Sequence, residues 1–223
     1  KPQAQAPRPA GGPRVPKLSD KVAYWSGAVF AVGRRDGDTV VLSVDPRAGA
    51  AYAAVWAGLT YELFGVRAEL PPPAADGLQE ARLPVAGLED FVNRLDLKPG
   101  TTRPPAPRWS WSNPDWKRAF LKGLVDASAE LTDAPALFLP GFGDPLRRSV
   151  EKLLSGLAVP VAAAEGGTLA VEGLEAVEKY WTAVGSDNPK LREALQARYP
   201  NAVPPAPSAA PAPDAPAAGA AEG

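Results

Sequence analysis

The sequence predicts an α+β protein made of two repeats, each with the order helix, hairpin, helix, hairpin, helix. Two helix-like stretches far apart in the chain carry a glycine inside their apolar run, at Gly27 and Gly123. An Asp-Pro dipeptide recurs at the matching place in each half, and the segment VAGLE at 85–89 returns as VEGLE at 171–175. Landmarks that recur in the same order indicate an internal duplication.

The two glycine-bearing helices have clear start signals. Ser19 or Asp20 can cap the first, and Asn113 can cap the second, whose first residue is Pro114. A side-chain oxygen at the cap satisfies a free backbone N–H, and a proline at the first position has no N–H to satisfy. A glycine inside a helix costs about 0.5–1 kcal/mol relative to alanine. Its presence in both helices indicates that two backbones approach closely, so we predict that the helices pack on each other at these glycines.

The rest of the first repeat follows from turn and periodicity signals. Asp36-Gly37 is a type I′ turn signal, and the residues that follow it, TVVLSV at 39–44, are predicted to form a strand. Asp45-Pro46 is expected to open the middle helix and Gly65 to close it. The remaining elements are short strands at 66–70 and 78–85 and a helix at 87–96.

The second repeat is predicted in the same order. Its glycine-bearing helix, at 114–127, leads to a hairpin turn around residues 132–135. Asp144-Pro145 opens the middle helix, as the earlier Asp-Pro pair does in the first repeat, and Gly156 closes it. The remaining elements are strands at 136–139, 157–164 and 168–171, a helix at 173–184 and a further helix from Asn188-Pro189 to about Arg198.

Composition divides the chain into a folded part and two tails. Proline, alanine and glycine dominate the first 16 residues and everything after Tyr199, with almost no large apolar side chains. Such segments bury too little apolar surface to offset the entropy of ordering, so we expect them to be disordered. The predicted organisation is a tail at 1–16, one repeat at 17–97, a linker at 98–112, a second repeat at 113–199 and a tail at 200–223.

Composition also limits the chemistry. The chain has no cysteine, histidine or methionine, which excludes Cys/His zinc sites, thiol nucleophiles, histidine-based triads and disulfides. No apolar run reaches the length of about 18 residues that a membrane-spanning helix needs, so we expect no membrane contact. We also expect the protein to be cytoplasmic and monomeric. A formal net charge of −1 and a pI of about 5.7 argue against an overall basic footprint for nucleic acid.

Aligned on their glycines, the segments WSGAVFAVG at 25–33 and LKGLVDASA at 121–129 resemble LAGLIDADG, the signature of the homing endonucleases. The resemblance covers nearly all of residues 19–185. It implies that the two helices pair about a pseudo-twofold axis and that the hairpins form a saddle-shaped antiparallel sheet along the DNA major groove. Each half would then be one αββαββα repeat of a two-repeat, single-chain member of the family.

The resemblance also implies where catalytic acids would stand. In the family, each signature helix supplies an acid from its eighth position to a divalent-metal site. Here the eighth positions are Val32 and Ser128. Asp126 stands at the sixth position, roughly 200° round the helix from the eighth, because each residue turns the helix by about 100°. We therefore predict a degenerate member with no catalytic residues, no metal ligands and no cofactor, which is not an enzyme and acts as a DNA-binding or regulatory factor.

Double-stranded DNA is the first partner that the resemblance implies. The expected contacts are arginines near the strands of the first repeat, namely Arg34, Arg35, Arg47, Arg67 and Arg82, whereas the matching strands of the second repeat have no Lys or Arg. The linker adds a second expected contact, because basic and aromatic groups that can stack on single-stranded bases occur together at Arg108, Trp109 and Trp111. Two plainer interpretations stay open: the arginines only solubilise the surface, and the tryptophans only hold the linker against the core.

A protein partner is the alternative. The predicted strands of the second repeat are unusually apolar, and alternation along a strand would send some of these side chains to the open face of the sheet. An exposed apolar patch marks a partner site more often than a nucleic-acid site. The residues concerned are Leu137, Phe138, Leu139, Phe142, Val159 and Val161.

Overall fold

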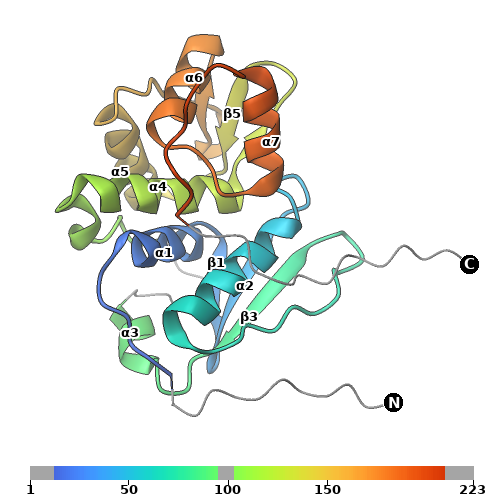
Figure 1. Cartoon of the computed structure of the whole chain (residues 1–223), viewed down its shortest axis with the longest axis vertical. Coiled ribbons are helices and arrows are strands. Elements are labelled where there is room, and N and C mark those ends of the chain that lie inside the picture. The colour runs from blue at the N-terminus through green and yellow to red at the C-terminus, as the bar shows by residue number, and fades with distance from the viewer. Residues whose placement is uncertain (1–12, 95–102, 209–223) are drawn as a thin grey trace, which may run out of the picture.

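The computed structural model describes residues 13–94 and 103–208, and in these ranges two similar halves pack together through their first helices (Figure 1). The first half contains α1 (Asp20–Val32), β1 (Gly33–Asp36), β2 (Thr39–Val44), α2 (Ala51–Phe64), β3 (Gln79–Pro84) and α3 (Glu89–Arg94). The second contains the 3-10 turn η1 (Arg108–Trp111), α4 (Pro114–Ser128), β4 (Glu130–Leu131), β5 (Ala136–Leu139), α5 (Asp144–Ser155), β6 (Ala162–Ala163), the turn η2 (Glu165–Gly167), β7 (Leu169–Glu172), α6 (Leu174–Ala183) and α7 (Pro189–Arg198). Within the described ranges, none of the helices is long and apolar enough to cross a membrane.

Helices α1 and α4 begin where the sequence predicts. The hydroxyl of Ser19 accepts a hydrogen bond from the N–H of Val22 at 3.3 Å, and the side chain of Asn113 accepts one from the N–H of Asp115 at 2.8 Å, with Pro114 as the first residue of α4. Each cap satisfies a backbone N–H that helix geometry leaves free. Both helices end in an extended residue, so each delivers the chain directly into the first strand of its half.

The central glycines allow α1 and α4 to touch along their backbones. A Cβ atom placed on Gly27 would lie 2.0 Å from the carbonyl oxygen of Phe120, and one placed on Gly123 would lie 1.9 Å from the carbonyl oxygen of Tyr24. Tyr24 stands three residues before Gly27, and Phe120 stands three residues before Gly123. The two contacts are therefore equivalent, as a pseudo-twofold axis between the helices requires.

Each half carries one antiparallel sheet. The strand order is β1-β2-β3 in the first sheet and β4-β5-β7-β6 in the second. In the first sheet an isolated bridge pairs Glu69 with Arg82 of β3, at the place that β6 takes beside β7. Both halves thus follow the order helix, hairpin, helix, hairpin, helix, and the predicted α+β fold of two repeats is confirmed.

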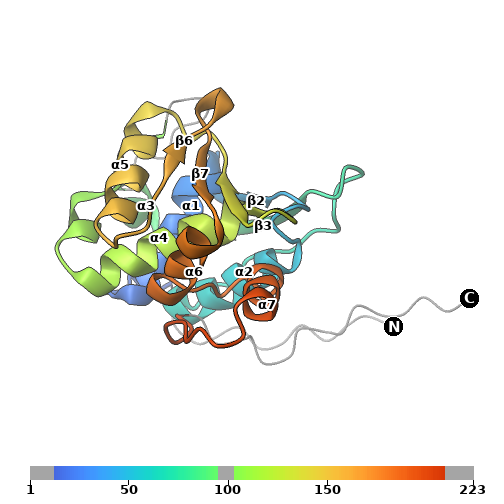
Figure 2. The same ribbon diagram turned by 90° about the horizontal axis from the view of Figure 1, so that it is seen from above.

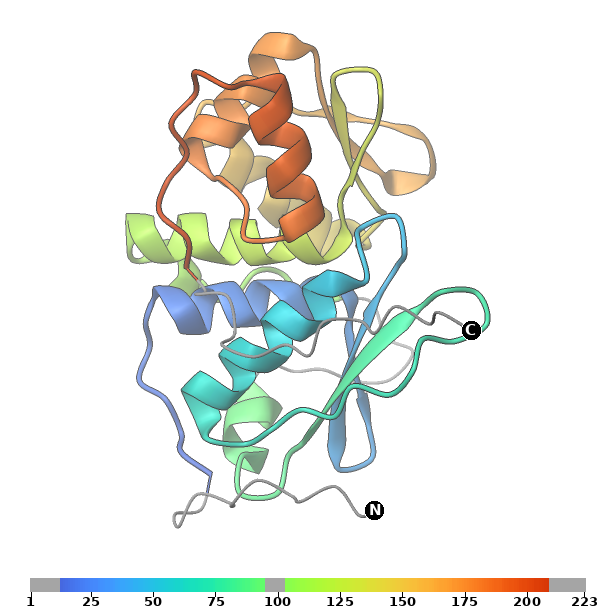
Figure 3. The same cartoon turned by 45° about the vertical axis from the view of Figure 1, so that its right-hand side comes forward.

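The helices cover one face of each sheet and leave the other face open. Helix α2 packs on β2 and β3, and α6 packs on β5 and β7, while α7 reaches back to α2 of the first half (Figures 2 and 3). The core of the first half is aromatic: the rings of Trp25 and Trp56 stack with 5.3 Å between their centroids, and both are fully buried. Burial of such large rings supplies much of the hydrophobic stabilisation, at about 25 cal/mol per Å².

Three predicted elements of the first half differ in the structure. Helix α2 begins at Ala51 and not at Asp45-Pro46, because the Asp45 carboxylate accepts from the N–H of Arg47 at 2.8 Å in a turn and Gly49 has a φ of +98°, which no right-handed helix continues. The strand predicted at 66–70 is reduced to the single bridge at Glu69. Helix α3 starts two residues later than predicted, and its predicted end lies outside the described residues.

The described part of the predicted C-terminal tail, residues 200–208, lies against the fold. The ammonium group of Lys122 donates to the carbonyl of Ala206 at 3.3 Å and to the hydroxyl of Ser208 at 3.1 Å, and the N–H of Ser208 donates to Asp187 at 2.7 Å. A proline-rich segment has few donors but keeps every carbonyl as an acceptor. The carbonyl groups of this segment can therefore accept hydrogen bonds from a buried cation such as Lys122.

The described part of the predicted N-terminal tail also contacts the fold. Its described residues, 13–16, follow the surface of the first half, where the N–H of Arg14 donates to the carbonyl of Phe64 at 2.9 Å. Pro13 lies against Gly87, at the point where a Cβ on that glycine would be 2.5 Å from the ring. Residues 1–12 and 209–223 of the predicted tails, and residues 95–102 at the start of the linker, lie outside the described ranges.

Candidate nucleic-acid interface

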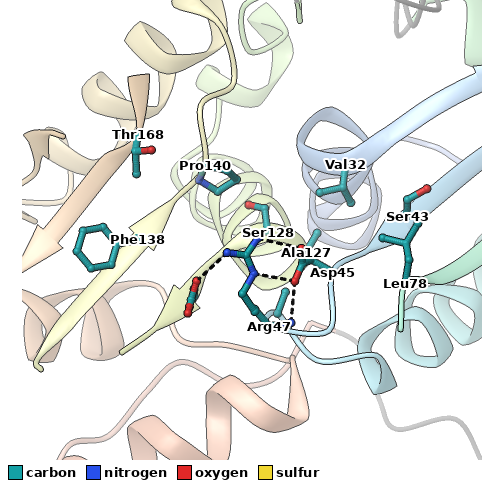
Figure 4. Close-up of a pocket in the computed structure, with 12 residues that line it drawn as sticks. Val32, Ser43, Asp45, Arg47, Leu78, Ala127, Ser128, Phe138, Pro140 and Thr168 are labelled. Carbon is teal, nitrogen blue, oxygen red and sulfur yellow. Dashed lines mark hydrogen bonds and ion pairs between the residues drawn. The ribbon is translucent and has the colours of Figure 1, made fainter. Parts of the chain in front are cut away.

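A cavity of about 450 Å³ lies where α1 and α4 end, between the two sheets (Figure 4). Val32, the last residue of α1, and Ser128, the last residue of α4, both line it. The first sheet contributes Ser43 and the second contributes Phe138. Because the lining comes from both halves, the cavity depends on the packing of α1 against α4.

One guanidinium group at this cavity joins acids from the two halves (Figure 4). Arg47 donates to the carboxylate of Asp45 through Nε at 3.0 Å and Nη2 at 3.1 Å, and its Nη1 lies 3.6 Å from Oε2 of Glu130. The hydrogen bonds from Arg47 hold the pKa of Asp45 below its ordinary value. The Arg47 side chain is 70% exposed, so water screens these pairs and they add little to stability.

The open face of the first sheet carries two arginines side by side. In β2 every second side chain, starting with Val40, is fully buried against the helices, so the intervening side chains point to the open face. The strand register places Arg34 of β1 and Arg82 of β3 on either side of Val41. Val41 is only 2% exposed although it faces away from the core, and the long apolar stems of flanking arginines are able to cover such a side chain.

A single carboxylate holds both arginines. Arg34 donates to Oε1 of Glu80 through Nη2 at 2.7 Å, and Arg82 donates to Oε2 of Glu80 through Nη2 at 2.7 Å and Nε at 3.0 Å. Hydrogen bonding from Arg34, followed by that from Arg82, lowers the pKa of Glu80. The register puts Asp36 and Glu69 on the same face. Acids therefore balance the arginines on this face, and it carries no net excess of positive charge.

The open face of the second sheet is apolar and acidic. The register aligns Phe138 of β5 with Glu130 on one side and with Ala170 and then Ala162 on the other. Phe138 is half-buried and lines the cavity. The strands of this sheet contain no Lys or Arg, so the two sheets present different chemistry on the same side of the molecule.

Solved structures share the fold of this chain, with its two central helices and two sheets. I-DmoI in complex with DNA and Mn matches with a TM-score of 0.51 and 18% sequence identity, over 74% of this chain and 96% of that chain. Mesophilic variants of the homing endonuclease I-DmoI match with a TM-score of 0.55 and 16% identity, over 80% and 97% of the two chains. The N-terminal LAGLIDADG domain of DUF199/WhiA matches with a TM-score of 0.53 and 14% identity, over 77% and 84%. The chain has the LAGLIDADG fold. No protein-family model and no curated protein matches its sequence.

The ends of the LAGLIDADG helices do not present ligands that fit a divalent metal. Val32 has no ligand atom, and the hydroxyl of Ser128 is neutral and donates to the carbonyl of Leu124 at 2.7 Å. The acids nearest these positions, Asp45 and Glu130, pair with Arg47 and not with each other. Across residues 13–94 and 103–208, no group of three or more acidic, histidine or cysteine side chains is placed to hold a metal ion.

The prediction that the chain is not an enzyme is nevertheless wrong. The solved structures with the same LAGLIDADG fold include those of I-DmoI, a homing endonuclease, in complex with DNA and Mn. The prediction was drawn from two positions, Val32 and Ser128. The absence of acidic side chains at these two positions does not establish that the chain is inactive.

The LAGLIDADG fold separates the other arginines that were predicted to bind DNA. Arg35 pairs in register with Val40, so it points away from the open face, and its Nη1 donates to the side chain of Asn93. Arg67 follows α2, and its guanidinium carbon lies 5.3 Å from the centre of the Tyr61 ring. Of the five arginines predicted near the strands, Arg34 and Arg82 stand together, and Arg47 lies at the cavity.

The predicted linker contact lies at the opposite end of the LAGLIDADG helices. Turn η1, which contains Arg108, Trp109 and Trp111, comes just before the first residue of α4, whereas the cavity lies at the last. The Trp109 ring packs edge-on against Trp116 and Phe120, with centroids 6.3 and 6.5 Å apart. Trp109 of the linker thus packs on α4, and this segment does not share a surface with Arg34 and Arg82.

Most of the apolar side chains proposed as a protein-binding face are in the core. Leu137, Leu139, Phe142 and Val159 are at most 5% exposed. Only Phe138 and Val161 of that set are half-buried. The alternation along β5 sends its leucines inward and Phe138 to the open face.

The acids of this surface were missed at the level of sequence. Glu80, Asp45 and Glu130 stand among the expected basic contacts: Glu80 pairs with Arg34 and Arg82, and the other two pair with Arg47. A usable signal exists for Glu80, because residues two apart in a strand share a face and Glu80 precedes Arg82 by two. The contact between Glu130 and Arg47 joins the two halves, and only the fold brings it together.

Proposed function

We propose that the chain binds double-stranded DNA on the side where the open sheet faces and the cavity lie. The observation that carries this proposal is the placement of Arg34 and Arg82 side by side on a sheet face that no helix covers. A two-stranded β-ribbon fits the major groove, which is about 12 Å wide. Fold neighbours of this chain have been solved in complex with DNA, which supports the same use of the surface here.

The charge balance of the surface sets the expected strength of binding. Glu80 pairs with both arginines and offsets one of their two positive charges, and Asp36 and Glu69 add further negative charge to the first face. Non-specific DNA binding comes almost wholly from neutralised phosphates. We therefore expect weak binding to random duplex, with dissociation constants of roughly 10⁻⁴–10⁻⁶ M at physiological salt.

Replacing both Arg34 and Arg82 by alanine tests the proposal. The double variant removes two cations from the DNA-facing surface, so the slope of log K against log salt should fall by about 2, with affinity for a random duplex lower at every salt concentration. Fluorescence anisotropy with a labelled duplex, from low to physiological salt, measures both quantities. Arg148→Ala is the matched control, because Arg148 is 69% exposed and lies on helix α5 and not on a strand. Absence of any duplex binding by the wild type at low salt would refute the proposal.

We further propose that the chain acts as a monomer. Both sheets and both LAGLIDADG helices are already present in one chain, so no second copy is needed to complete the surface. Light scattering should return the mass of one chain, 23.2 kDa, with and without DNA. A dimer mass would contradict this proposal.

A further inference from the structure

We infer that this chain reads DNA with its first sheet alone, and that Glu80 is the positioning residue for the two arginines that do so. This inference rests on the proposal that the chain binds double-stranded DNA. It adds the side of the molecule that makes the contact and the length of DNA that is read. It also assigns a role to the Glu80 carboxylate, whose negative charge by itself opposes DNA binding.

The first sheet has the size and donors to read a short stretch of major groove. Strand β2 has six residues, which span roughly 20 Å at about 3.3 Å per residue. That length matches about six base pairs at 3.4 Å each. Arg34 and Arg82 flank the strand across Val41, and an arginine fork that bonds O6 and N7 of guanine is the commonest specific contact in this groove.

The second sheet has neither the size nor the hydrogen-bond donors to read a stretch of major groove. Strands β4 and β6 have two residues each, and the row across the sheet at Phe138 is completed by Glu130, Ala170 and Ala162. Alanine side chains are too short to reach base edges and carry no donor. The Glu130 carboxylate would face a phosphate backbone with like charge. The chemistry of this sheet therefore does not support readout of a second half-site.

Glu80 fixes the direction in which the two arginines point. It accepts from Arg34 on one carboxylate oxygen and from Arg82 on the other, and Arg34 also donates to the hydroxyl of Ser43. A guanidinium held by one carboxylate keeps further N–H donors free, since arginine has five. Pairing with Glu80 weakens the non-specific attraction of Arg34 and Arg82 for phosphates, but it fixes the orientation of their guanidinium groups. Base recognition needs a fixed orientation, whereas phosphate contact does not.

A selection from a duplex pool with a randomised centre, followed by hydroxyl-radical footprinting, tests the one-sided contact. We expect the recovered sequences to share a single preferred run of about six base pairs that contains guanine, with protection confined to that run and its flanks. Two preferred runs, or protection of equal strength on both sides of the centre, would overturn the inference while leaving DNA binding intact. Recovery of no duplex above background would instead refute the proposed function.

Glu80→Gln tests the positioning role with a side chain of the same shape. Loss of the carboxylate should raise affinity for random duplex roughly three- to tenfold, and lower the preference for the selected sequence over a scrambled one about tenfold. Glu151→Gln is the matched control, because Glu151 pairs with Arg147 on α5, and it should change neither quantity. Arg34→Lys should keep the random-duplex affinity and lose the preference, since an ammonium group lacks the fork. An unchanged preference in both Glu80→Gln and Arg34→Lys would overturn the role of Glu80.

Discussion

Replacement of Gly123 by alanine should prevent stable folding of this chain, and Gly27→Ala should do the same. Ordinarily a glycine-to-alanine change inside a helix stabilises by about 0.5–1 kcal/mol. Here the added methyl group would lie 1.9 Å from the carbonyl oxygen of Tyr24, or 2.0 Å from that of Phe120. The obstacle in both places is backbone, which cannot rotate away as a side chain can. The steric cost therefore exceeds the gain in propensity, and we expect a loss of more than about 3 kcal/mol.

Urea denaturation followed by tryptophan fluorescence measures this effect, because Trp25 and Trp56 are fully buried. Gly37→Ala is a suitable control, since a Cβ at Gly37 meets nothing within 4 Å and only the φ of +54° opposes it. That change should cost about 1 kcal/mol. Equal midpoints for Gly123→Ala and the wild type would show that the helices do not meet as described. Unequal effects of the two central alanines would count against the pseudo-twofold relation.

The fold was largely predictable from the sequence because its signals are local and repeated. Strands β2 and β5 have the predicted limits, 39–44 and 136–139, and the caps at Ser19 and Asn113 act as expected. A repeated motif adds a check that a single motif lacks, since each half supports the assignment of the other. The family resemblance of the two glycine-bearing helices then supplied the pairing.

The start of the middle helix was predicted wrongly in the first half, because the same Asp-Pro signal has different tertiary surroundings in the two halves. Asp144-Pro145 starts α5, but the same dipeptide at Asp45-Pro46 forms a turn. The difference is Gly49, whose φ of +98° ends any helix begun at Asp45. Its neighbours there, Lys190 and Asn188, come from the far end of the chain. A local pattern contains no information about that contact.

The site was predictable only in part for the same reason. Basic residues could be assigned to the strands of the first half, but the face that each one occupies depends on the hairpin register. A shift of one position would exchange Arg34 and Arg35 between the open face and the core face. The acids that balance these arginines come from a neighbouring strand or from the other half, and charge composition cannot identify their partners.

The second large effect concerns Asp126, which the structure buries completely and places away from the cavity. Its carboxylate accepts hydrogen bonds from the hydroxyl of Tyr24 at 2.8 Å and of Ser186 at 2.5 Å, and from the N–H groups of Asp187 at 2.7 Å and Asn188 at 3.2 Å. These donors come from α1 and from the segment that precedes α7, so one side chain joins both halves to the C-terminal helix. Asp126→Ala removes the acceptor shared by four buried donors, of which the N–H of Asn188 keeps the Ser186 hydroxyl at 3.1 Å, and it should cost about 3–5 kcal/mol.

Asp126→Asn separates the charge of this group from its hydrogen bonds. The asparagine oxygen can accept from the two N–H groups, and its amide can donate to the Ser186 hydroxyl. We therefore expect the asparagine variant to be clearly more stable than the alanine variant. Asp115→Asn is the control for surface aspartates, since the Asp115 side chain is 73% exposed, and it should change stability by less than about 0.5 kcal/mol.

The wild-type chain should lose stability as pH rises from about 5 to 8, because of Asp126. Burial, and then the charge of Asp187, raise the pKa of Asp126 to about 7 from an ordinary value of 3.8. Between these values the folded chain binds a proton that the unfolded chain has released, so stability falls with rising pH. The tyrosines that face Asp126 do not titrate in this window, because burial raises the pKa values of Tyr24, Tyr52 and Tyr180.

Urea titrations at several pH values from 5 to 8 measure this slope, and Asp126→Asn should abolish it because an amide does not titrate. Asp45 and Glu80 have lowered pKa values, so their contribution to stability is lost only as pH falls below their ordinary values of 3.8 and 4.5. The two effects therefore occupy separate pH ranges. A wild-type stability that rises between pH 5 and 8, or a slope that survives in Asp126→Asn, would show that another group titrates. A wild-type stability that does not change between pH 5 and 8 would instead mean that Asp126 is ionised throughout this range, with its four hydrogen-bond donors compensating the charge of the carboxylate.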